Sequence, residues 1–484
     1  TTHYEGSPGH ACFKYTFSTK DKFILNLSGE KDAGEAFFRG EQKYGFDFYS
    51  GSICLKDLNV VKKLVLGDYR LDFGQGLLMG SSLLSGRGSG ANNIRHFSNG
   101  IRAIAPINEG DFLRGFATTL GNSTWSGSVF GGRQFGGIDN HFGGDLSFRQ
   151  ALFKIGVRFV CHTSTDTSSG SFSQRLKSDI HPNGFNIGVD YQVLVKHAIL
   201  WGEVASDENW NIGLVQNVLF NLTPSSKLAI VFRHYDNGFS SPLGKSFAAN
   251  SQRQGETGIY ATGNFILGRK CEAELFMDYY RLSCPSYRTD APIQAFDIGA
   301  TARYSFSHHS VISFKYTFKN KPRNNAGNPY YKEISEQYRH KINCLLNISP
   351  YLFLKLKTGL GWTLQQEPLA KEKHSGFLIY QDAAITVNRP DITLHFRLAF
   401  FDTDRYDERL YAYEDDVYYA FTIGSYYYKG IRGYLVLHYK YKCISLWLRL
   451  AQTYFIDREI ISSGLTEIDE PHKTDIKVQF MFSL

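Results

Sequence analysis

The stretch Phe153-Lys154-Ile155-Gly156-Val157-Arg158-Phe159-Val160-Cys161 alternates apolar with polar or small residues. Successive side chains of a β-strand point to opposite faces, so Phe153, Val157 and Phe159 share one face, and Lys154 and Arg158 share the other. The same alternation recurs at Leu228 to Arg233, Phe296 to Ser305, Ile312 to Lys319, Ile392 to Phe400 and Ile444 to Ala451. This pattern predicts strands with one apolar and one polar face.

The composition also favours strands. The 484 residues include 30 Tyr, 38 Phe and 46 Gly, and no proline-rich linker or charge block divides them. Aromatic residues suit strands and glycine suits turns, so we expect an all-β chain with a single domain over residues 1–484. No stretch reaches the roughly 18 apolar residues of a membrane-spanning helix.

Connections of two lengths favour a transmembrane β-barrel over a large soluble β protein, which is the alternative. Tight turns are expected at Leu194 to His197, Pro224 to Ser226, Gly268 to Lys270, Ser307 to His309, Ser349 to Tyr351 and Arg389 to Asp391. Long polar loops are expected at Thr163 to Asn183, Asn237 to Gly255, Asn320 to Glu336, Gln365 to Ser375 and Asp457 to His472. A large antiparallel barrel of roughly 22 to 26 strands, with short periplasmic turns and long extracellular loops, accounts for both lengths.

The ends of the chain and its aromatic clusters support the same fold. Three tyrosine clusters stand where strands meet loops, which predicts an aromatic girdle: Tyr279-Tyr280, Tyr330-Tyr331 and Tyr426-Tyr427-Tyr428. The last residues, Ile476 to Leu484, alternate like a final strand and look like the assembly signal of outer-membrane proteins. The sequence begins at Thr1 without a leader, so we expect a processed or truncated chain.

A glycine-punctuated stretch from Lys62 to Leu84 interrupts the alternation. Gly74-Gln75-Gly76 lacks the Lys-Ser/Thr pair of a phosphate loop, so we interpret the stretch as part of an inward-folded segment near residues 62–97. The predicted constriction residues are Gly67, Asp68, Tyr69, Arg70, Asp72, Gly74, Gln75 and Gly76.

Three motifs carry a family resemblance: Glu30-Lys31-Asp32-Ala33-Gly34-Glu35, Gly45-Phe46-Asp47-Phe48-Tyr49-Ser50 and Leu66-Gly67-Asp68-Tyr69-Arg70-Leu71-Asp72-Phe73-Gly74-Gln75-Gly76-Leu77. They resemble a family of Bacteroidota outer-membrane β-barrel proteins in which a periplasmic helix-hairpin-helix region, similar to that of competence proteins, precedes the barrel. The resemblance extends to Asn108-Glu109 and to Ser463-Gly464. The helix-hairpin-helix region itself is absent from these residues, so the resemblance implies only a weak link to nucleic acid.

The polar face is expected to be rich in cations. The predicted lumen-lining residues are Lys154, Arg158, Arg233, Arg303, Lys315, Lys319, Lys341, Lys355, Lys357, His395, Arg397 and Arg449. One hypothesis is a lumen that attracts anions, because low-dielectric walls focus the field of fixed charges. The alternative is that these cations pair with carboxylates on adjacent strands.

An acidic stretch lies between Phe400 and Asp416 and ends in Glu414-Asp415-Asp416. A surface calcium site is one interpretation, but EF-hand spacing is absent, so a solvated acidic loop is the preferred prediction. No metal site, cofactor or catalytic residue is predicted, because no local group sets a nucleophile beside a base. The seven cysteines are expected to be small apolar fillers, with one loop disulfide as the alternative.

The sequence therefore predicts a non-enzymatic, integral protein of the bacterial outer membrane. It would act as a channel or import conduit, or else as a structural subunit of a larger secretion, assembly or surface complex with a plugged lumen. The expected partners are outer-membrane lipid, lipopolysaccharide and proteins of such a complex. The net charge of +7 is compatible with these anionic neighbours.

Overall fold

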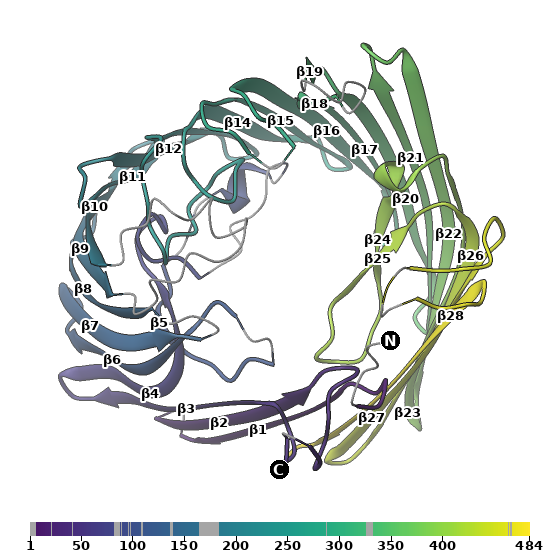
Figure 1. Ribbon diagram of the computed structural model, residues 1–484, viewed down its shortest axis with the longest axis horizontal. Helices are drawn as coiled ribbons and strands as arrows, with labels where there is room; N and C mark the ends of the chain where they lie inside the picture. Colours follow the sequence, from purple (N-terminus) through teal and green to yellow (C-terminus); the bar gives the residue numbers. More distant parts are fainter. Residues whose placement is uncertain are drawn as a thin grey trace. The chain divides into compact units, whose positions relative to one another are not determined.

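The computed structural model describes residues 6–20, 22–40, 42–81, 88, 90–94, 96, 98–107, 110–135, 139–163, 183–286, 288–325, 333–462, 464 and 467–484. Among these residues, 24 strands belong to one sheet and two small hairpins form separate sheets (Figure 1). The prediction of an all-β chain with roughly 22 to 26 strands is confirmed. The chain divides into two compact units, Thr1–Thr262 with Asp278–Ser286, and Gly263–Met277 with Tyr287–Leu484.

No helix within the described ranges is long and apolar enough to cross a membrane.

The first unit is an antiparallel meander in which neighbouring strands follow each other along the chain. Its strands are β1 (Ala11–Thr19), β2 (Phe23–Lys31), β3 (Phe48–Leu58), β4 (Val61–Asp72), β5 (Gly100–Ala103), β6 (Leu113–Gly121), β7 (Trp125–Gln134), β8 (Asn140–Arg149), β9 (Phe153–Thr163), β10 (Asn183–Val195), β11 (Ala198–Asp207), β12 (Ile212–Thr223) and β13 (Ser226–Tyr235), and it contains the 3₁₀ turn η1 (Ala91–Asn93). The strands β14 (Glu256–Leu267) and β15 (Cys271–Leu282) each contribute residues to both units.

The second unit continues the antiparallel pattern. Its sheet strands are β16 (Ile293–Ser307), β17 (Ser310–Asn320), β20 (Tyr338–Tyr351), β21 (Leu354–Glu367), β22 (Glu372–Asn388), β23 (Asp391–Thr403), β26 (Lys429–Tyr441), β27 (Ile444–Phe455) and β28 (His472–Phe482). Two hairpins, β18 (Arg323–Asn324) with β19 (Ile334–Ser335) and β24 (Leu410–Glu414) with β25 (Thr422–Tyr426), and the 3₁₀ turn η2 (Tyr406–Glu408) lie in its connections.

Each strand has one apolar and one polar face. On β9, Val157 and Phe159 are 45% and 52% exposed, whereas Arg158 between them is fully buried. We call the face that carries Val157 and Phe159 the apolar face, and the opposite one the polar face, in both units. Large apolar side chains that remain exposed while charged ones are buried are the reverse of a water-soluble sheet, and they fit strands surrounded by lipid. The fold is thus that of a large antiparallel transmembrane β-barrel.

Most predicted turns are confirmed, and two connections differ. The turn expected at Ser349 to Tyr351 lies at residues 352–353, because a register shift between Ile348 and Tyr351 lets β20 continue past Pro350. The long loop expected at Gln365 to Ser375 is a short turn, because the ladder between β21 and β22 extends to the pair Glu367 and Glu372.

Several sequence predictions fall on residues outside the described ranges. They concern most of the loop from Thr163 to Asn183, Tyr330-Tyr331, Asn108-Glu109 and Ser463. All seven cysteines are described, and none of them forms a disulfide bond.

Three segments leave the sheet and pack on its polar face. In the first unit, residues 73–81 and 236–255 do so, which confirms an inward-folded segment after β4. In the second unit, residues 404–428 do so, with the hairpin β24–β25 packed against β21 and β22 (Figure 1).

The triplet Tyr426 to Tyr428 belongs to this last segment, so its assignment to an aromatic girdle is wrong. Tyr426 is fully buried and packs on Phe401. Tyr427 and Tyr428 pack against the same apolar cluster.

Candidate functional site

The predicted lumen cations occupy the polar face of their strands. Lys154 and Arg158 lie on β9 and Arg233 on β13, in the first unit. The other nine lie in the second unit, and they are Arg303, Lys315, Lys319, Lys341, Lys355, Lys357, His395, Arg397 and Arg449. Arg158, Arg233, Arg397 and Arg449 are each at most 1% exposed, although burial of an unpaired charge is strongly unfavourable. Each of the four must therefore be compensated.

Arg158 is compensated by three carboxylates from neighbouring strands. Its Nε lies 2.9 Å from Oδ1 of Asp145 on β8, and its Nη1 lies 3.3 Å from Oε1 of Glu203 on β11. Its Nη2 donates to Asp190 on β10. Lys154 Nζ adds a longer contact of 3.9 Å to Asp190 Oδ2. The antiparallel register brings these strands together, which the sequence separations alone do not show.

Glu203 also fixes the glycine-rich segment that follows β4. Its Oε2 accepts hydrogen bonds from the backbone N–H groups of Gln75, at 2.6 Å, and Leu77, at 3.1 Å. Gly74 has a φ of +57°, and a Cβ on it would lie 2.4 Å from Arg158 Nη1. Residues 74–77 therefore cover the charged cluster, and the residue nearest to Arg158, Gly74, has no side chain.

The eight predicted constriction residues divide into two groups. Gly74, Gln75 and Gly76 belong to the segment over the polar face, whereas Gly67 to Asp72 belong to β4 itself. Gly67 has a φ of +96° and marks a break in alternation, after which Asp68 and Tyr69 are both buried. The full set is Gly67, Asp68, Tyr69, Arg70, Asp72, Gly74, Gln75 and Gly76.

Two carboxylates of β4 hold neighbouring chain segments. Asp68 accepts from Arg114 Nε at 2.6 Å and from Ser50 Oγ at 2.6 Å. Asp72 pairs with His96 Nε2 at 2.8 Å and accepts from Asn99 Nδ2 at 3.0 Å.

A second buried cluster anchors the connection between β13 and β14. Arg233 Nη1 lies 2.8 Å from Asp278 Oδ1, and Arg233 Nε donates to Glu256. Glu256 Oε2 in turn accepts from the backbone N–H groups of Asn250, at 2.7 Å, and Ala249, at 3.0 Å. Both segments over the polar face of the first unit are thus held by backbone hydrogen bonds to buried carboxylates.

In the second unit, Arg397 forms a bidentate pair with Asp382. Nε and Nη2 of Arg397 lie 2.5 and 2.6 Å from the two carboxylate oxygens. The guanidinium stands 4.1 Å from the ring centroid of Tyr380, and Lys357 Nζ approaches Asp382 Oδ2 at 3.8 Å. This two-point geometry is the strongest ion-pair arrangement that arginine offers.

The structure corrects the prediction of a solvated loop for the end of the acidic stretch before β25. Glu414 is fully buried and accepts from Arg432 Nε at 2.8 Å, from Arg449 Nη2 at 2.6 Å and from Tyr426 OH at 2.8 Å. Asp416, with a side chain 1% exposed, accepts from Lys477 Nζ at 2.6 Å. Glu414 and Asp416 are therefore neither solvated loop residues nor ligands of a surface calcium site, because they supply the counter-charges that buried arginines of the polar face require.

Ion pairs and hydrogen bonds lower the pKa of two aspartates in this segment, Asp415 and Asp416. A hydrogen bond with His395, at 3.1 Å, is the main cause that lowers the pKa of Asp415, and burial opposes it. Burial raises the pKa of Asp416, but hydrogen bonds from Lys477 and Thr422 outweigh it, and the net pKa is lowered. Both groups are therefore charged in the folded protein at neutral pH.

The remaining predicted cations are more exposed. Lys319 Nζ lies 3.2 Å from Asp297 Oδ2, and Arg303 Nη1 lies 3.7 Å from both Glu272 and Glu274. Lys315, Lys341 and Lys355 form no ion pair within the described part of the chain. Cross-strand pairing thus accounts for most of the predicted cations, and these three lysines leave positive charge on β17, β20 and β21.

Among the residues that the structure describes, one group of side chains could hold a metal ion. Ligand atoms of His10, Glu30 and Asp32 all lie within 4.8 Å of one another, with His10 Nε2 2.7 Å from Glu30 Oε1. The sequence pattern predicts no metal site there. The group arises because the register of β1 and β2 pairs Cys12 with Glu30, so that His10 lies near Asp32.

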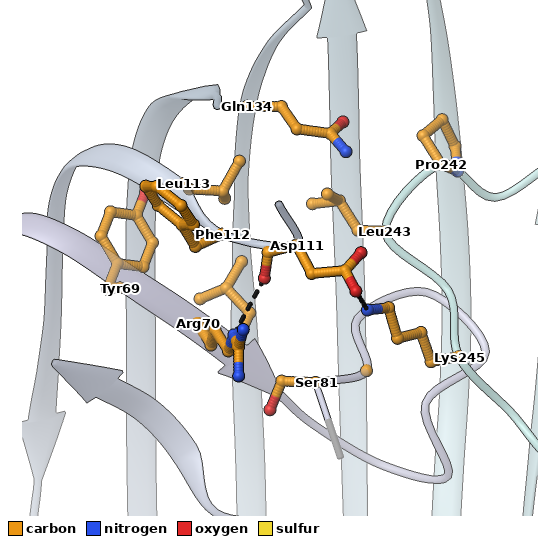
Figure 2. Close-up of a pocket in the computed structure, with 12 residues that line it drawn as sticks. Tyr69, Arg70, Ser81, Asp111, Phe112, Leu113, Gln134, Pro242, Leu243 and Lys245 are labelled. Carbon is orange, nitrogen blue, oxygen red and sulfur yellow. Dashed lines mark hydrogen bonds and ion pairs between the residues drawn. The ribbon is translucent and has the colours of Figure 1, made fainter. Parts of the chain in front are cut away.

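A pocket lies between β4, the start of β6 and the two packed segments of the first unit (Figure 2). It contains about 380 Å³ of empty space, part of it open to solvent. Arg70 Nε donates to the backbone oxygen of Asp111 at 3.0 Å, and Lys245 Nζ lies 2.7 Å from Asp111 Oδ2 (Figure 2). The sequence predicts a role for Arg70 but not for Asp111 or Lys245. These two residues lie in loops that pack against β4 beside Arg70.

An antiparallel sheet that exposes an apolar face and buries paired charges on the other defines an integral β-barrel protein of the outer membrane. No protein-family model matches the sequence. No curated protein matches it either.

Solved structures of outer-membrane proteins are similar to this chain at low identity. The outer membrane channel DcaP of Acinetobacter baumannii is 9% identical, with 88% of this chain and 99% of that chain covered and a TM-score of 0.34. An anion-selective porin from Comamonas acidovorans is 11% identical, with 74% and 99% covered and a TM-score of 0.33. The ferripyoverdine receptor of Pseudomonas aeruginosa is 8% identical, with 98% and 69% covered and a TM-score of 0.43.

Proposed function

We propose that this protein is a non-enzymatic outer-membrane conduit whose polar interior is closed, at rest, by segments of its own chain. The observation that carries the proposal is the attachment of these segments. Residues 74–77, 249–250 and 414–416 each bind a buried charge of the polar face. A barrel of this size has a wide interior, and chain segments inside it restrict passage.

An anion preference is part of this proposal. Lys315, Lys341 and Lys355 lie on three consecutive sheet neighbours, β17, β20 and β21, and no ion pair within the described residues neutralises them. Positive charge on a low-dielectric wall raises the local concentration of anions. The anions would meet these lysines once the segments over the polar face move.

The second candidate function is a structural subunit of an outer-membrane complex, permanently plugged. The observation that favours it is the depth of the ion pairs: Glu203, Glu256 and Glu414 are fully buried, and release of such groups would expose unpaired charges. Nucleic acid as a cargo, and membership of the Bacteroidota family with a helix-hairpin-helix region, stay predictions from the resemblance alone.

The experiment is conductance in planar lipid bilayers. The native chain is compared with a variant in which a short Gly-Ser linker replaces residues 406–426, and with a control in which the same linker replaces residues 368–371 of a surface turn. We expect low conductance from the native chain and the control, and larger steps that favour anions from the first variant. A native chain that is a constitutively open pore would contradict the closed conduit. A silent first variant that is folded would favour the structural subunit.

A further inference from the structure

The pocket of Figure 2 has an apolar wall and a polar opening. Leu71, Phe112 and Leu113 contribute the wall and are each at most 5% exposed. Pro242 and Leu243, from the connection between β13 and β14, complete it. Such a surface accommodates a short apolar body, because its contact with the solute removes apolar area from water.

The frame of the pocket is fixed by backbone hydrogen bonds. Lys245 N donates to Gly76 O at 2.7 Å, and Gly80 N donates to Leu243 O at 2.9 Å. A Cβ on Gly80 would lie 2.9 Å from the Cβ of Lys245, so glycine is needed for this approach. Lys245 is therefore held at a set position beside β4, although it comes from a loop.

Hydrogen-bond donors outnumber acceptors among the polar side chains of the pocket. Arg70 uses Nε for the Asp111 carbonyl, and its two Nη groups donate to no side chain or backbone atom among the described residues. Gln134 Oε1 forms a hydrogen bond with His141 Nε2. The side-chain amide N–H groups of Gln134 donate to no atom among the described residues. Asp111 is the single carboxylate of the lining, and Lys245 neutralises it. The guanidinium of Arg70 thus gives the pocket a net positive charge and a two-point donor.

We propose that this pocket binds a compact organic anion, in which a carboxylate is joined to a short apolar body. The carboxylate would accept hydrogen bonds from the two Nη groups of Arg70, because the planar guanidinium matches the spacing of the two carboxylate oxygens. Lys245 and Gln134 would flank the carboxylate, and the apolar body would lie on Leu71, Phe112 and Leu113. Asp111 would hold Lys245 and Arg70 in place from between them (Figure 2).

This inference deepens the proposed conduit by naming a class of solute. It rests on the conduit function only for the role of the bound solute, because binding itself does not require passage. Binding is measured on the full chain in detergent and conductance in bilayers, so failure of one leaves the other result intact.

The test is titration of the full chain with 4,4,4-trifluorobutyrate, followed by fluorine NMR. The uncharged amide of the same acid is the matched ligand control, because it has the same apolar body. We expect saturable binding of the acid and none of the amide. Arg70→Gln should weaken the binding about tenfold or more, since a charged hydrogen bond is removed. Arg149→Gln, an exposed arginine at the end of β8, should leave it unchanged.

Lys245→Gln is the second variant, and it keeps the proposal testable if Arg70→Gln does not fold. This substitution should also weaken the binding of the acid, because Asp111 would then add an unneutralised negative charge to the pocket. Inorganic phosphate is titrated in parallel to separate a general anion site from a carboxylate site. Equal binding of acid and amide, no effect of either variant, or binding of phosphate without the acid would overturn the proposal.

Discussion

The carboxylate of Glu203 on β11 accepts the backbone N–H of Gln75 at 2.6 Å, across 128 residues of sequence. The same carboxylate faces Arg158, so one buried group both compensates a cation of the polar face and holds a chain segment over it. Compensation of the buried arginine and attachment of residues 74–77 are therefore coupled, and a change at either partner is expected to affect both.

Glu203→Gln should loosen residues 73–81. The substitution replaces the charged acceptor of the Gln75 and Leu77 N–H groups by a neutral amide, at a cost of about 2 kcal/mol, while Asp145 and Asp190 still compensate Arg158. We expect a lower free energy of unfolding in urea titrations in lipid vesicles, and faster proteolysis after β4. Glu272→Gln, which changes a carboxylate that is 55% exposed, is the control and should have little effect. Equal protease resistance of the Glu203→Gln variant and the native chain would contradict the anchoring role.

Gly74→Ala should be more harmful than Gly76→Ala. Both glycines have positive φ, which costs an alanine about 1–2 kcal/mol. Only at Gly74 would the new Cβ also collide, 2.4 Å from Arg158 Nη1 and 2.7 Å from Glu203 Oε2, whereas the nearest atom at Gly76 is 3.5 Å away.

Gly268→Ala separates these two effects, because its φ is +75° and its Cβ would meet no atom within 4 Å. Unfolding free energies should fall least and about equally for Gly268→Ala and Gly76→Ala, and further for Gly74→Ala. The same loss in all three variants would rule out close packing at Gly74.

The attachment of residues 404–428 should weaken in acid. The folded protein lowers the pKa of Asp415 and Asp416, so their charged forms stabilise it above the ordinary aspartate pKa of about 4. This contribution is lost as the pH falls below about 4 and through the lowered values in the folded state.

Asp416→Asn measures that contribution directly. At pH 7 the variant should unfold more easily than the native chain, by about 2–3 kcal/mol, because Lys477 and Arg449 lose a counter-charge. The difference between the two chains should shrink as the pH is lowered from 5 to 2. A difference that stays constant over this range would show that the charge of Asp416 is not what holds the segment.

The lysines without ion pairs should set the anion preference of the opened barrel. In the chain that lacks residues 406–426, Lys315→Gln, Lys341→Gln and Lys355→Gln together should lower the permeability ratio of chloride to potassium, about twofold or more. Lys357→Gln, in which the lost cation is a partner of Asp382, is the control and should change the ratio less. Reversal potentials in a salt gradient measure the ratio, and an unchanged ratio in the triple variant would refute the anion preference.

The strands and their two faces could be predicted from the amino-acid sequence. The alternation around Arg158 and Arg397 predicted the polar side correctly, because strand geometry is local and repeats every two residues. Gly74 and Gly76 likewise indicated that the chain leaves the sheet there, since positive φ is a property of the local backbone.

The partners of the buried charges and the course of the inward-folded segments became known from the folded structure alone. Glu414 and Asp416 looked like solvated residues in the sequence, yet they lie against Arg449, which follows them by more than thirty residues. Likewise, Asp111 and Lys245 meet beside Arg70 only because two loops pack on one strand. Ion pairs and pockets depend on strand register and loop packing, which join residues far apart in the chain, and no local pattern encodes them.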